Sequence, residues 1–242
     1  AKGVHVITEA DLDSPDATLQ NGTVVIRSHG VGKPIYDKLK EKNISYVDVT
    51  CPFVLKIHRI VEKESLAGNH IIIIGDKDHP EVQGICGWCQ GPYTVIRNKE
   101  EAEAFVPPKG KKISIVSQTT FNYNKFKDLV EILCKKRYDN NVLNILNILN
   151  TICNATEERQ REAKNIAGEV DTMLVVGGRH SSNTQKLFEI CKKECGNTYY
   201  IQTPVDLDSE MFQCSSYVGI TAGASTPKKI IEEVQEHVRI KF

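Results

Sequence analysis

Apolar runs and amphipathic segments alternate along this chain. Runs rich in β-branched and apolar residues at 44–49, 70–74 and 171–176 predict strands, and the first of them reads as a buried strand. Val54, Ile57 and Val61 recur at helical spacing after the first run and predict an amphipathic helix there. Alternating strands and helices are typical of parallel sheets, whose ligands gather at the carboxyl ends of the strands.

Two cysteines mark a repeat within this pattern. Cys153 follows Cys51 by 102 positions, and a glycine at the end of an apolar run lies 24 residues after each of them, at Gly75 and Gly177. One spacing that is kept through two unlike sequences indicates a repeated unit of strand, cysteine, helix and strand.

Each of these cysteines stands at a predicted helix start. Pro52 suits the first turn of a helix that Gly68 ends, and the segment after Cys153 is helix-prone until Gly168 closes it. A thiol in that position lies among unpaired N–H groups that favour a thiolate. Two such thiols could converge on one metal centre, whereas the alternative is that each is a small buried hydrophobe.

The connection from a strand to a helix occurs three more times. In each case a β-branched strand ends in small and polar residues before an amphipathic helix. The strands lie at 23–30, 112–120 and 216–225, and the helices at 33–42, 123–135 and 227–237. The simplest account is three pseudo-repeated α/β domains with parallel sheets around a central site, the first domain incomplete, with limits near 1–50, 51–150 and 151–242.

Three stretches carry weaker patterns. Residues 4–7 are strand-like, and the Asn-rich stretch 138–150 should supply the strand before Cys153. The charged stretch 98–112, which contains Pro107 and Pro108, is expected to be a solvated loop.

Composition narrows the classes of function. The 242 residues are 40% apolar and 26% charged, as in an ordinary soluble globular protein. Lys plus Arg and Asp plus Glu both total 31, and a net charge of zero argues against a general nucleic-acid surface. No apolar run approaches the roughly 20 residues that span a bilayer, and no signal peptide is visible. Eight cysteines without secretory features indicate metal or redox use in a reducing compartment, so we expect a cytoplasmic location.

Histidine and carboxylate side chains follow two of the predicted strands. His29 precedes a helix start, where an imidazole and backbone N–H groups can bind phosphate together, although an ordinary loop histidine also fits this position. His79 and Glu81 flank Pro80, and such a pair can divide anion binding and proton delivery. A carboxylate near a helix start can also serve only as a cap.

Short hydroxyl and amide side chains follow other predicted strands. Ser181, Ser182 and Asn183 stand beside a helix start, where they suit phosphate oxygens but equally suit plain N-capping. All of these candidates lie at strand ends, where parallel sheets bind their ligands. Further hydroxyls at strand ends come from Thr119, Thr120 and Ser225.

The remaining cysteines allow another interpretation. Cys86 and Cys89 form a Cys-x-x-Cys pair, which can be a redox pair or half of a zinc site. No second pair with zinc spacing follows, so we expect this pair to be structural. The same is expected of Cys134, Cys191, Cys195 and Cys214.

Five motifs occur in one order along the chain. The motifs are Thr50-Cys-Pro-Phe-Val54, Asp78-His-Pro-Glu-Val-Gln-Gly84, Ser117-Gln-Thr-Thr120, Ser181-Ser-Asn183 and Thr221-Ala-Gly-Ala-Ser225. Together they closely resemble those of the 4-hydroxy-3-methylbut-2-enyl diphosphate reductases, the IspH or LytB family, and the resemblance covers essentially the whole chain. It implies three α/β domains around an iron–sulfur cluster, and an isoprenoid-biosynthesis enzyme that removes an allylic hydroxyl with two electrons to give isopentenyl and dimethylallyl diphosphates.

The resemblance also implies a role for each candidate residue. Cys51 and Cys153 would be ligands of a 4Fe–4S cluster, Glu81 would deliver protons, and Thr119 would help to place the hydroxyl. A cubane cluster held by three thiolates leaves one iron free to take the substrate oxygen. The implied partners are the allylic diphosphate and an electron donor such as ferredoxin or flavodoxin. The diphosphate would be held by His29, His79, Ser181, Asn183 and Ser225, with Ser182 nearby.

One departure from the family concerns the start of the chain. The family carries its third thiolate, in a Gly-Phe-Cys segment, and another diphosphate-binding histidine upstream of the position where this chain begins. We therefore expect an N-terminally truncated form that has two of the three cluster ligands. Two other functions stay open: a non-catalytic protein that binds a phosphate ligand, and a zinc or dithiol protein built on Cys86 and Cys89.

Overall fold

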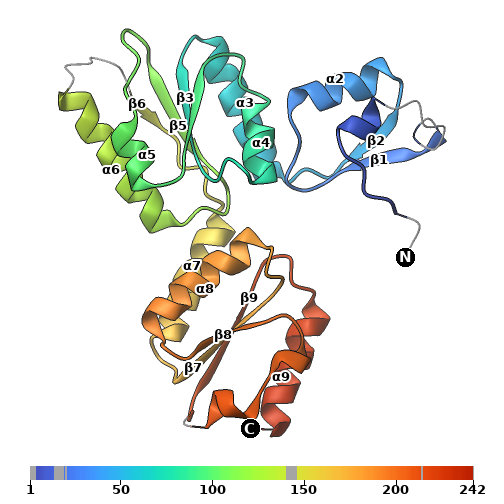
Figure 1. The fold of residues 1–242 in the computed structure, drawn as a ribbon, viewed down its shortest axis with the longest axis vertical. Coiled ribbons are helices and arrows are strands. Elements are labelled where there is room, and N and C mark those ends of the chain that lie inside the picture. Colours follow the sequence, from blue (N-terminus) through green and yellow to red (C-terminus); the bar gives the residue numbers. More distant parts are fainter. Residues whose placement is uncertain (1–3, 14–18, 20, 140–145, 214, 242) are drawn as a thin grey trace. The chain divides into compact units, whose positions relative to one another are not determined.

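The computed structural model describes residues 4–13, 19, 21–139, 146–213 and 215–241. Strands and helices alternate through these residues, and the described strands form three parallel sheets (Figure 1). The predicted α/β class with parallel sheets is therefore confirmed. The chain divides into two compact units, Ala1–Thr119 with Asn124–Thr151, and Thr120–Tyr123 with Ile152–Phe242. The three predicted domains and their limits stay a prediction.

The N-terminal part of the first unit is a two-stranded sheet with one connecting helix. Strands β1 (Thr23–Ile26) and β2 (Ser45–Asp48) pair in parallel, and α2 (Lys33–Glu41) connects them. A short 3-10 helix, Ala10–Leu12, precedes the sheet. The core of this part is formed by Leu12, Ile26, Tyr36, Leu39 and Ile44.

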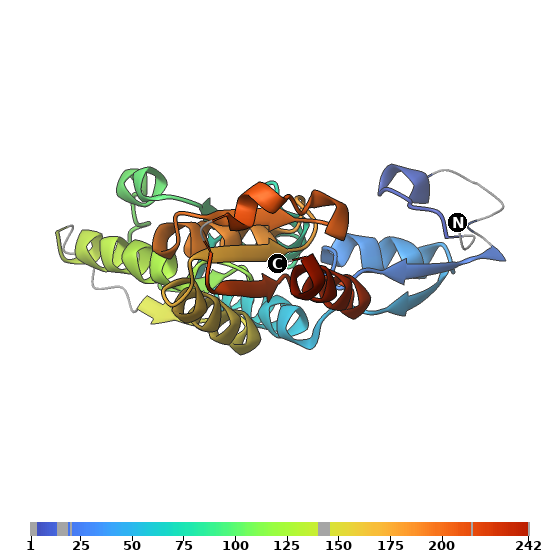
Figure 2. The ribbon, with the colours of Figure 1, turned by 90° about the horizontal axis from the view of Figure 1, so that it is seen from below.

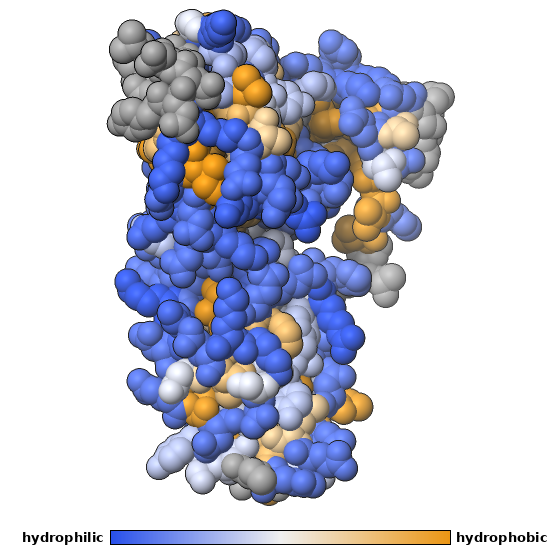
Figure 3. Space-filling model, turned by 60° about the vertical axis from the view of Figure 1, so that its left-hand side comes forward, coloured by the Kyte–Doolittle hydropathy of each residue, from blue (hydrophilic) through white to orange (hydrophobic). Residues whose placement is uncertain are grey.

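The strand predicted at 44–49 is present as β2, but the prediction that it is buried is wrong. Val47 is 51% exposed, and its ladder partner Val25 is 61% exposed, because α2 covers only one face of the two strands. β-Branched residues fit a pleated strand whether or not its face is covered, so the sequence pattern does not report burial. Residues 4–7 form no strand, and Val6 is 97% exposed. Figure 3 shows apolar side chains at the surface among a mostly hydrophilic exterior.

The larger part of the first unit is a four-stranded parallel sheet in the order β4-β3-β5-β6. Figure 1 shows α3 and α4 on one side of this sheet and α5 and α6 on the other. The predicted apolar face of α3 is confirmed, since Val54, Ile57 and Val61 are all buried. The elements are α3 (Pro52–Leu66), β3 (His70–Ile74), α4 (Pro80–Cys86), β4 (Tyr93–Ile96), α5 (Lys99–Ala104), β5 (Ile113–Ser117), α6 (Tyr123–Asp139) and β6 (Leu146–Ile148).

The sequence pattern predicted a solvated loop at 98–112, and this prediction is wrong for the first part of the stretch, which forms α5. Asn98 caps this helix, and its side-chain oxygen accepts a hydrogen bond from the Glu101 N–H at 2.8 Å. Asparagine is a preferred N-cap, so the sequence held a local signal for this helix. The strand expected within 138–150 is present as β6, while residues 140–145 lie outside the described ranges.

The second unit has three layers, with the sheet β8-β7-β9 between two layers of helices (Figures 1 and 2). Met173 and Val175 pack in a cluster with residues of α7 and α8, and the alternate residue Leu174 points to the other side, toward Val234 of α9. The elements are α7 (Asn154–Ala167), β7 (Thr172–Val176), α8 (Ser182–Glu194), β8 (Thr198–Ile201), the 3-10 helices Pro204–Asp206 and Ser209–Phe212, β9 (Val218–Ala222) and α9 (Lys228–Lys241).

Within the described ranges, no helix combines the length and the apolar character that a membrane crossing requires.

Candidate functional site

A buried carboxylate lies at the carboxyl end of the larger sheet. Glu81, in the first turn of α4, is 2% exposed, and Thr119, just after β5, is 6% exposed. The Thr119 backbone N–H and hydroxyl donate to the two oxygens of the Glu81 carboxylate at 2.6 and 2.8 Å. Burial raises the pKa of Glu81, and the two hydrogen bonds from Thr119 oppose this rise. A buried carboxyl with a raised pKa can hold a proton near neutral pH and donate it to a bound molecule.

Two imidazoles lie beside this carboxylate. His79 is the N-cap of α4, and its Nδ1 accepts a hydrogen bond from the Glu81 N–H at 3.1 Å, so in the neutral ring Nε2 carries the proton. The rings of His79 and His29 contact edge to face with centroids 5.5 Å apart. Burial, with His29 and Arg27 nearby, lowers the pKa of His79 to about 4. Burial and Arg27 also lower the pKa of His29, so both rings are neutral N–H donors near pH 7.

These contacts bring together four of the residues predicted from the sequence, namely His29, His79, Glu81 and Thr119. The sequence reasoning missed Gln118, which is 2% exposed. Its side-chain oxygen accepts a hydrogen bond from the Asp76 N–H at 3.4 Å and so links β5 to the loop before α4. A polar residue inside the strand-end motif was the available signal for this role.

The second unit places small polar side chains at the start of α8. Ser181 is the N-cap, and its hydroxyl accepts a hydrogen bond from the Thr184 N–H at 3.4 Å. The hydroxyls of Ser182 and Thr120 lie 3.4 Å apart. Asn183 is 6% exposed, and neither its Oδ1 nor its Nδ2 has a hydrogen-bond partner among the described residues. A buried amide without a partner is costly, so this side chain is suited to a ligand that supplies both partners.

The loop after β9 lies next to the start of α8. A Cβ atom on Gly223 would lie 2.1 Å from the Thr184 hydroxyl oxygen, so only glycine allows this contact. Ser225, two residues later, is exposed. Its predicted role stays a prediction, although the loop that carries it contacts the turn after Asn183.

Both repeat cysteines stand where the sequence predicted. Cys51 is the N-cap of α3 and Cys153 is the N-cap of α7; both are partly exposed free thiols whose side chains make no capping hydrogen bond. Cys51 belongs to the first unit and Cys153 to the second, and their convergence stays a prediction. Among the described residues, no group of three His, Cys, Asp or Glu is arranged to hold a metal ion. Each thiol is by itself of a kind that can ligate a metal, because it is free and partly exposed.

Four of the remaining described cysteines fit the structural interpretation, while that of Cys134 stays a prediction. Cys86 and Cys89 pack against the core of the first unit, and Cys191 and Cys195 belong to the core of the second. Burial raises the pKa of Cys86, and it raises the pKa of Cys89 to about 12. Such thiols stay protonated at neutral pH, which disfavours a zinc or redox role. Cys214 lies outside the described residues.

The fold and these side chains define a class of protein: a parallel α/β protein with paired imidazoles and a buried, hydrogen-bonded carboxyl at strand ends and partly exposed thiols at helix starts. The chain belongs to the LytB protein family, whose sequence profile matches residues 1–239. Membership of this family implies a metal cofactor, and Cys51 and Cys153 are the described residues that fit it in part.

Individual relatives agree with the family. The chain is 44% identical over 238 residues to the 4-hydroxy-3-methylbut-2-enyl diphosphate reductase of Caldanaerobacter subterraneus subsp. tengcongensis, which covers 98% of this chain and 79% of the relative. It is 45% identical over 237 residues to the reductase of the same name from Alkaliphilus oremlandii, with coverage of 98% and 80%.

Two solved structures share the fold. One is the (E)-4-hydroxy-3-methyl-but-2-enyl diphosphate reductase, described as the terminal enzyme of the non-mevalonate pathway, with a TM-score of 0.61, 36% identity and coverage of 93% of this chain and 79% of that one. The other is the Plasmodium falciparum E-1-hydroxy-2-methyl-but-2-enyl-4-diphosphate reductase, with a TM-score of 0.82, 27% identity and coverage of 92% and 68%.

Proposed function

We propose that this chain catalyses the reductive dehydroxylation of 4-hydroxy-3-methylbut-2-enyl diphosphate to isopentenyl and dimethylallyl diphosphates, the last step of the non-mevalonate isoprenoid pathway. The names of the relatives support the reaction. The observation that carries the proposal is the buried carboxylate of Glu81, which is held by Thr119 beside two neutral imidazoles. A proton donor next to neutral N–H donors suits a substrate with a leaving hydroxyl and an anionic tail.

The diphosphate is bound by neutral hydrogen-bond donors rather than by a basic patch. His29 and His79 each offer one ring N–H, and the unpartnered amide of Asn183 offers two more donors. Ser181, Ser182 and Ser225 add hydroxyls. A chain with a net charge of zero has no long-range attraction for anions, so such local donors must supply the binding.

Glu81 delivers the protons in this proposal. Loss of the allylic hydroxyl as water consumes two protons and two electrons, one proton going to the departing oxygen and one to the allyl carbon. Burial raises the pKa of Glu81, which favours the protonated carboxyl, and Thr119 fixes the orientation of both oxygens. The Thr119 hydroxyl, which donates to Glu81, would also orient the substrate hydroxyl near this acid.

Cys51 and Cys153 would hold a 4Fe–4S cluster together with a further thiolate. When bound, the cluster supplies electrons and a Lewis-acidic iron. The position of both thiols at helix N-termini supports this assignment. Both are free, and neither side chain makes a capping hydrogen bond in the part of the chain that the structure describes. An electron donor such as ferredoxin or flavodoxin and a cytoplasmic location complete the proposal.

The test of the proton-delivery role is Glu81→Gln. The amide keeps the size of the side chain but has no acidic proton, so turnover should fall by about 100-fold or more while the binding of inorganic pyrophosphate stays unchanged. Glu100→Gln, on the exposed side of α5, is the matched control and should keep full turnover. Unimpaired turnover of Glu81→Gln would contradict the role.

Metal analysis after anaerobic purification distinguishes the reductase from the other functions. Iron and sulfide that are lost in Cys51→Ser and in Cys153→Ser support the reductase. Pyrophosphate binding without iron supports a non-catalytic binding protein. Zinc that is lost in Cys86→Ser supports a zinc or dithiol protein.

A further inference from the structure

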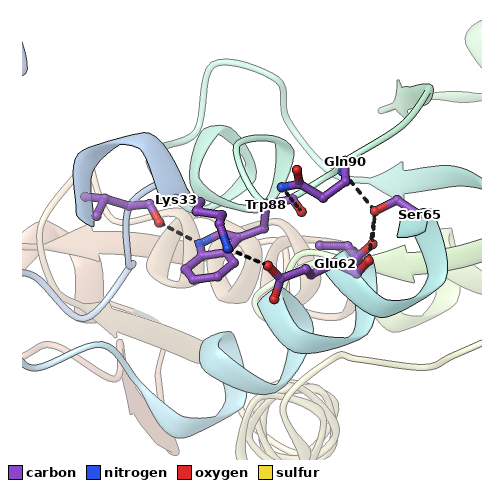
Figure 4. A network of polar contacts seen from close by, with 7 residues as sticks. Lys33, Glu62, Ser65, Trp88 and Gln90 are labelled. Atoms are coloured by element: carbon purple, nitrogen blue, oxygen red, sulfur yellow. Dashed lines mark hydrogen bonds and ion pairs between the residues drawn. The ribbon is translucent and has the colours of Figure 1, made fainter. Parts of the chain in front are cut away.

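Trp88, just after α4, lies at the centre of a set of contacts within the first unit (Figure 4). Its indole N–H donates to the Val31 carbonyl oxygen at 2.9 Å. The ring of Tyr36 lies edge-on to it with centroids 5.6 Å apart, and Lys33 Nζ lies 5.5 Å from the indole centroid. Lys33 also pairs with Glu62 at 2.8 Å, so Trp88 joins α2 and the loop before it to the larger sheet.

His58, on α3, stacks on Trp88. The ring centroids are 5.2 Å apart and the ring planes differ by 17°. His58 is 1% exposed, and neither ring nitrogen has a hydrogen-bond partner among the described residues. A buried imidazole without partners destabilises the fold relative to an apolar side chain of the same shape. The stability of the core therefore does not explain why an imidazole lies here.

The His58 ring lies directly behind the turn that carries His29. A Cβ atom on Gly30, which has φ +70°, would lie 2.7 Å from His58 Cε1 and 3.0 Å from Thr50 Cγ2. The Gly30 N–H donates to the Arg27 carbonyl oxygen at 2.9 Å and closes the turn around His29. The five-membered ring of His58 therefore packs directly against the backbone of this turn and leaves no room for a side chain at Gly30.

Two further contacts fix the same turn. The carbonyl oxygen of Ser28 accepts a hydrogen bond from the Cys51 N–H at 3.0 Å. A Cβ atom on Gly87 would lie 2.6 Å from the Cα of Gly32, so the end of α4 and the loop after His29 meet backbone to backbone. Gly87 and Trp88 are the two residues between Cys86 and Cys89, and they give the Cys-x-x-Cys segment a packing role that does not involve its thiols.

We propose that Trp88 and His58 are positioning residues, which hold the turn of His29 so that its imidazole meets the diphosphate. Trp88 acts through Val31, and His58 acts through Gly30. The inference rests on the proposed function, because it takes His29 as a ligand of the diphosphate. It adds two residues that touch no substrate and that lie outside the motifs shared with the family.

A double-mutant cycle on the full chain, purified anaerobically with the metal that it carries, tests this inference. The dissociation constant of inorganic pyrophosphate is measured by calorimetry for the unchanged protein, Trp88→Leu, His29→Ala and the double variant. We expect each single substitution to weaken binding by about tenfold, and the double variant to bind no more weakly than His29→Ala alone. Trp88→Phe keeps the stacking on His58 and should lose only about threefold, and it serves where Trp88→Leu does not fold. Tyr217→Leu, which removes a 70% exposed aromatic ring from the second unit, is the control and should not change binding.

The measurements distinguish a failure of the positioning role from a failure of the diphosphate role of His29. If His29→Ala weakens binding and Trp88→Leu either has no effect or multiplies the loss, the positioning role is overturned while the diphosphate role of His29 stands. If His29→Ala binds pyrophosphate as the unchanged protein does, the proposed role of His29 fails and the positioning role fails with it.

Discussion

Replacing His58 with phenylalanine should make the first unit more resistant to acid. Burial lowers the pKa of His58 to about 4 from its ordinary 6.5, while the nearby Asp48 carboxylate opposes this shift. Below pH 6.5 this imidazole is protonated in the unfolded chain, whereas in the folded chain it stays neutral until the pH falls to about 4. Folding therefore loses stability as the pH falls through this window, and phenylalanine removes that loss.

The size of the effect follows from the difference in pKa. Each unit corresponds to about 1.4 kcal/mol, so at pH 5 the protonation of His58 in the unfolded chain costs about 2 kcal/mol of folding stability. Because His58 is 1% exposed, solvent does not screen this cost. His79, whose pKa is also lowered to about 4, contributes a similar dependence that remains in the variant. The substitution should thus reduce the acid sensitivity without abolishing it.

Urea unfolding of the metal-free chain at pH 7 and pH 5 measures this effect, with the fluorescence of Trp88, the single tryptophan, reporting on the first unit. Strain from the larger phenylalanine ring does not depend on pH, so it cancels in the difference between the two pH values. We expect that difference to be about 2 kcal/mol smaller in His58→Phe. His180→Gln removes an exposed imidazole and controls for the loss of one histidine. Equal losses of stability in His58→Phe and the unchanged protein would refute the reasoning.

Two further substitutions test the second unit. Asn183→Leu should keep or raise the free energy of unfolding by about 1 kcal/mol, because it removes an unpartnered buried amide, yet it should weaken pyrophosphate binding at least tenfold in calorimetry; a large loss of stability with unchanged binding would contradict a ligand role. Gly223→Ala should cost about 1–3 kcal/mol in urea unfolding, because its Cβ would meet the Thr184 hydroxyl at 2.1 Å. Gly178→Ala, where a Cβ meets nothing within 4 Å, is the control and should change stability far less.

The elements of this fold were predictable where their signals are local. The helix starts after Cys51 and Cys153, and the helix end at Gly168, follow from Pro, cap and Gly signals within a few residues. Whether a strand is buried depends on which other elements cover it. The exposure of Val25 and Val47 therefore could not be predicted from their β-branched side chains.

The contacts of the site depended on strand order, which local patterns do not contain. The sequence placed Glu81 and Thr119 at strand ends, but only the pairing of β3 with β5 makes these residues neighbours. His58 was predictable in part, because it lies four residues after Val54 and three before Val61 and so falls on the apolar stripe of α3. Its contact with Gly30 joins separate parts of the unit and had no local signal.

The repeat explains why Asn183 lacks a partner while Glu81 has one. His79 and Ser181 each cap a helix 28 residues after the repeat cysteine, so Glu81 and Asn183 are equivalent buried residues at the second helical position. The strands beside them also correspond, since Ile74 pairs with Ser117 and Val176 pairs with Ala222.

Two residues after Ser117 stands Thr119, which satisfies Glu81, whereas two residues after Ala222 stands Ala224, which has no hydroxyl to offer. The first unit therefore satisfies its buried polar group internally and keeps the Glu81 carboxyl in a fixed orientation. The second unit leaves the equivalent group open to a partner from outside the described chain. Because a buried amide without partners lowers stability, we expect Asn183 to face a ligand, and the acceptor oxygens of a diphosphate would take its two N–H groups.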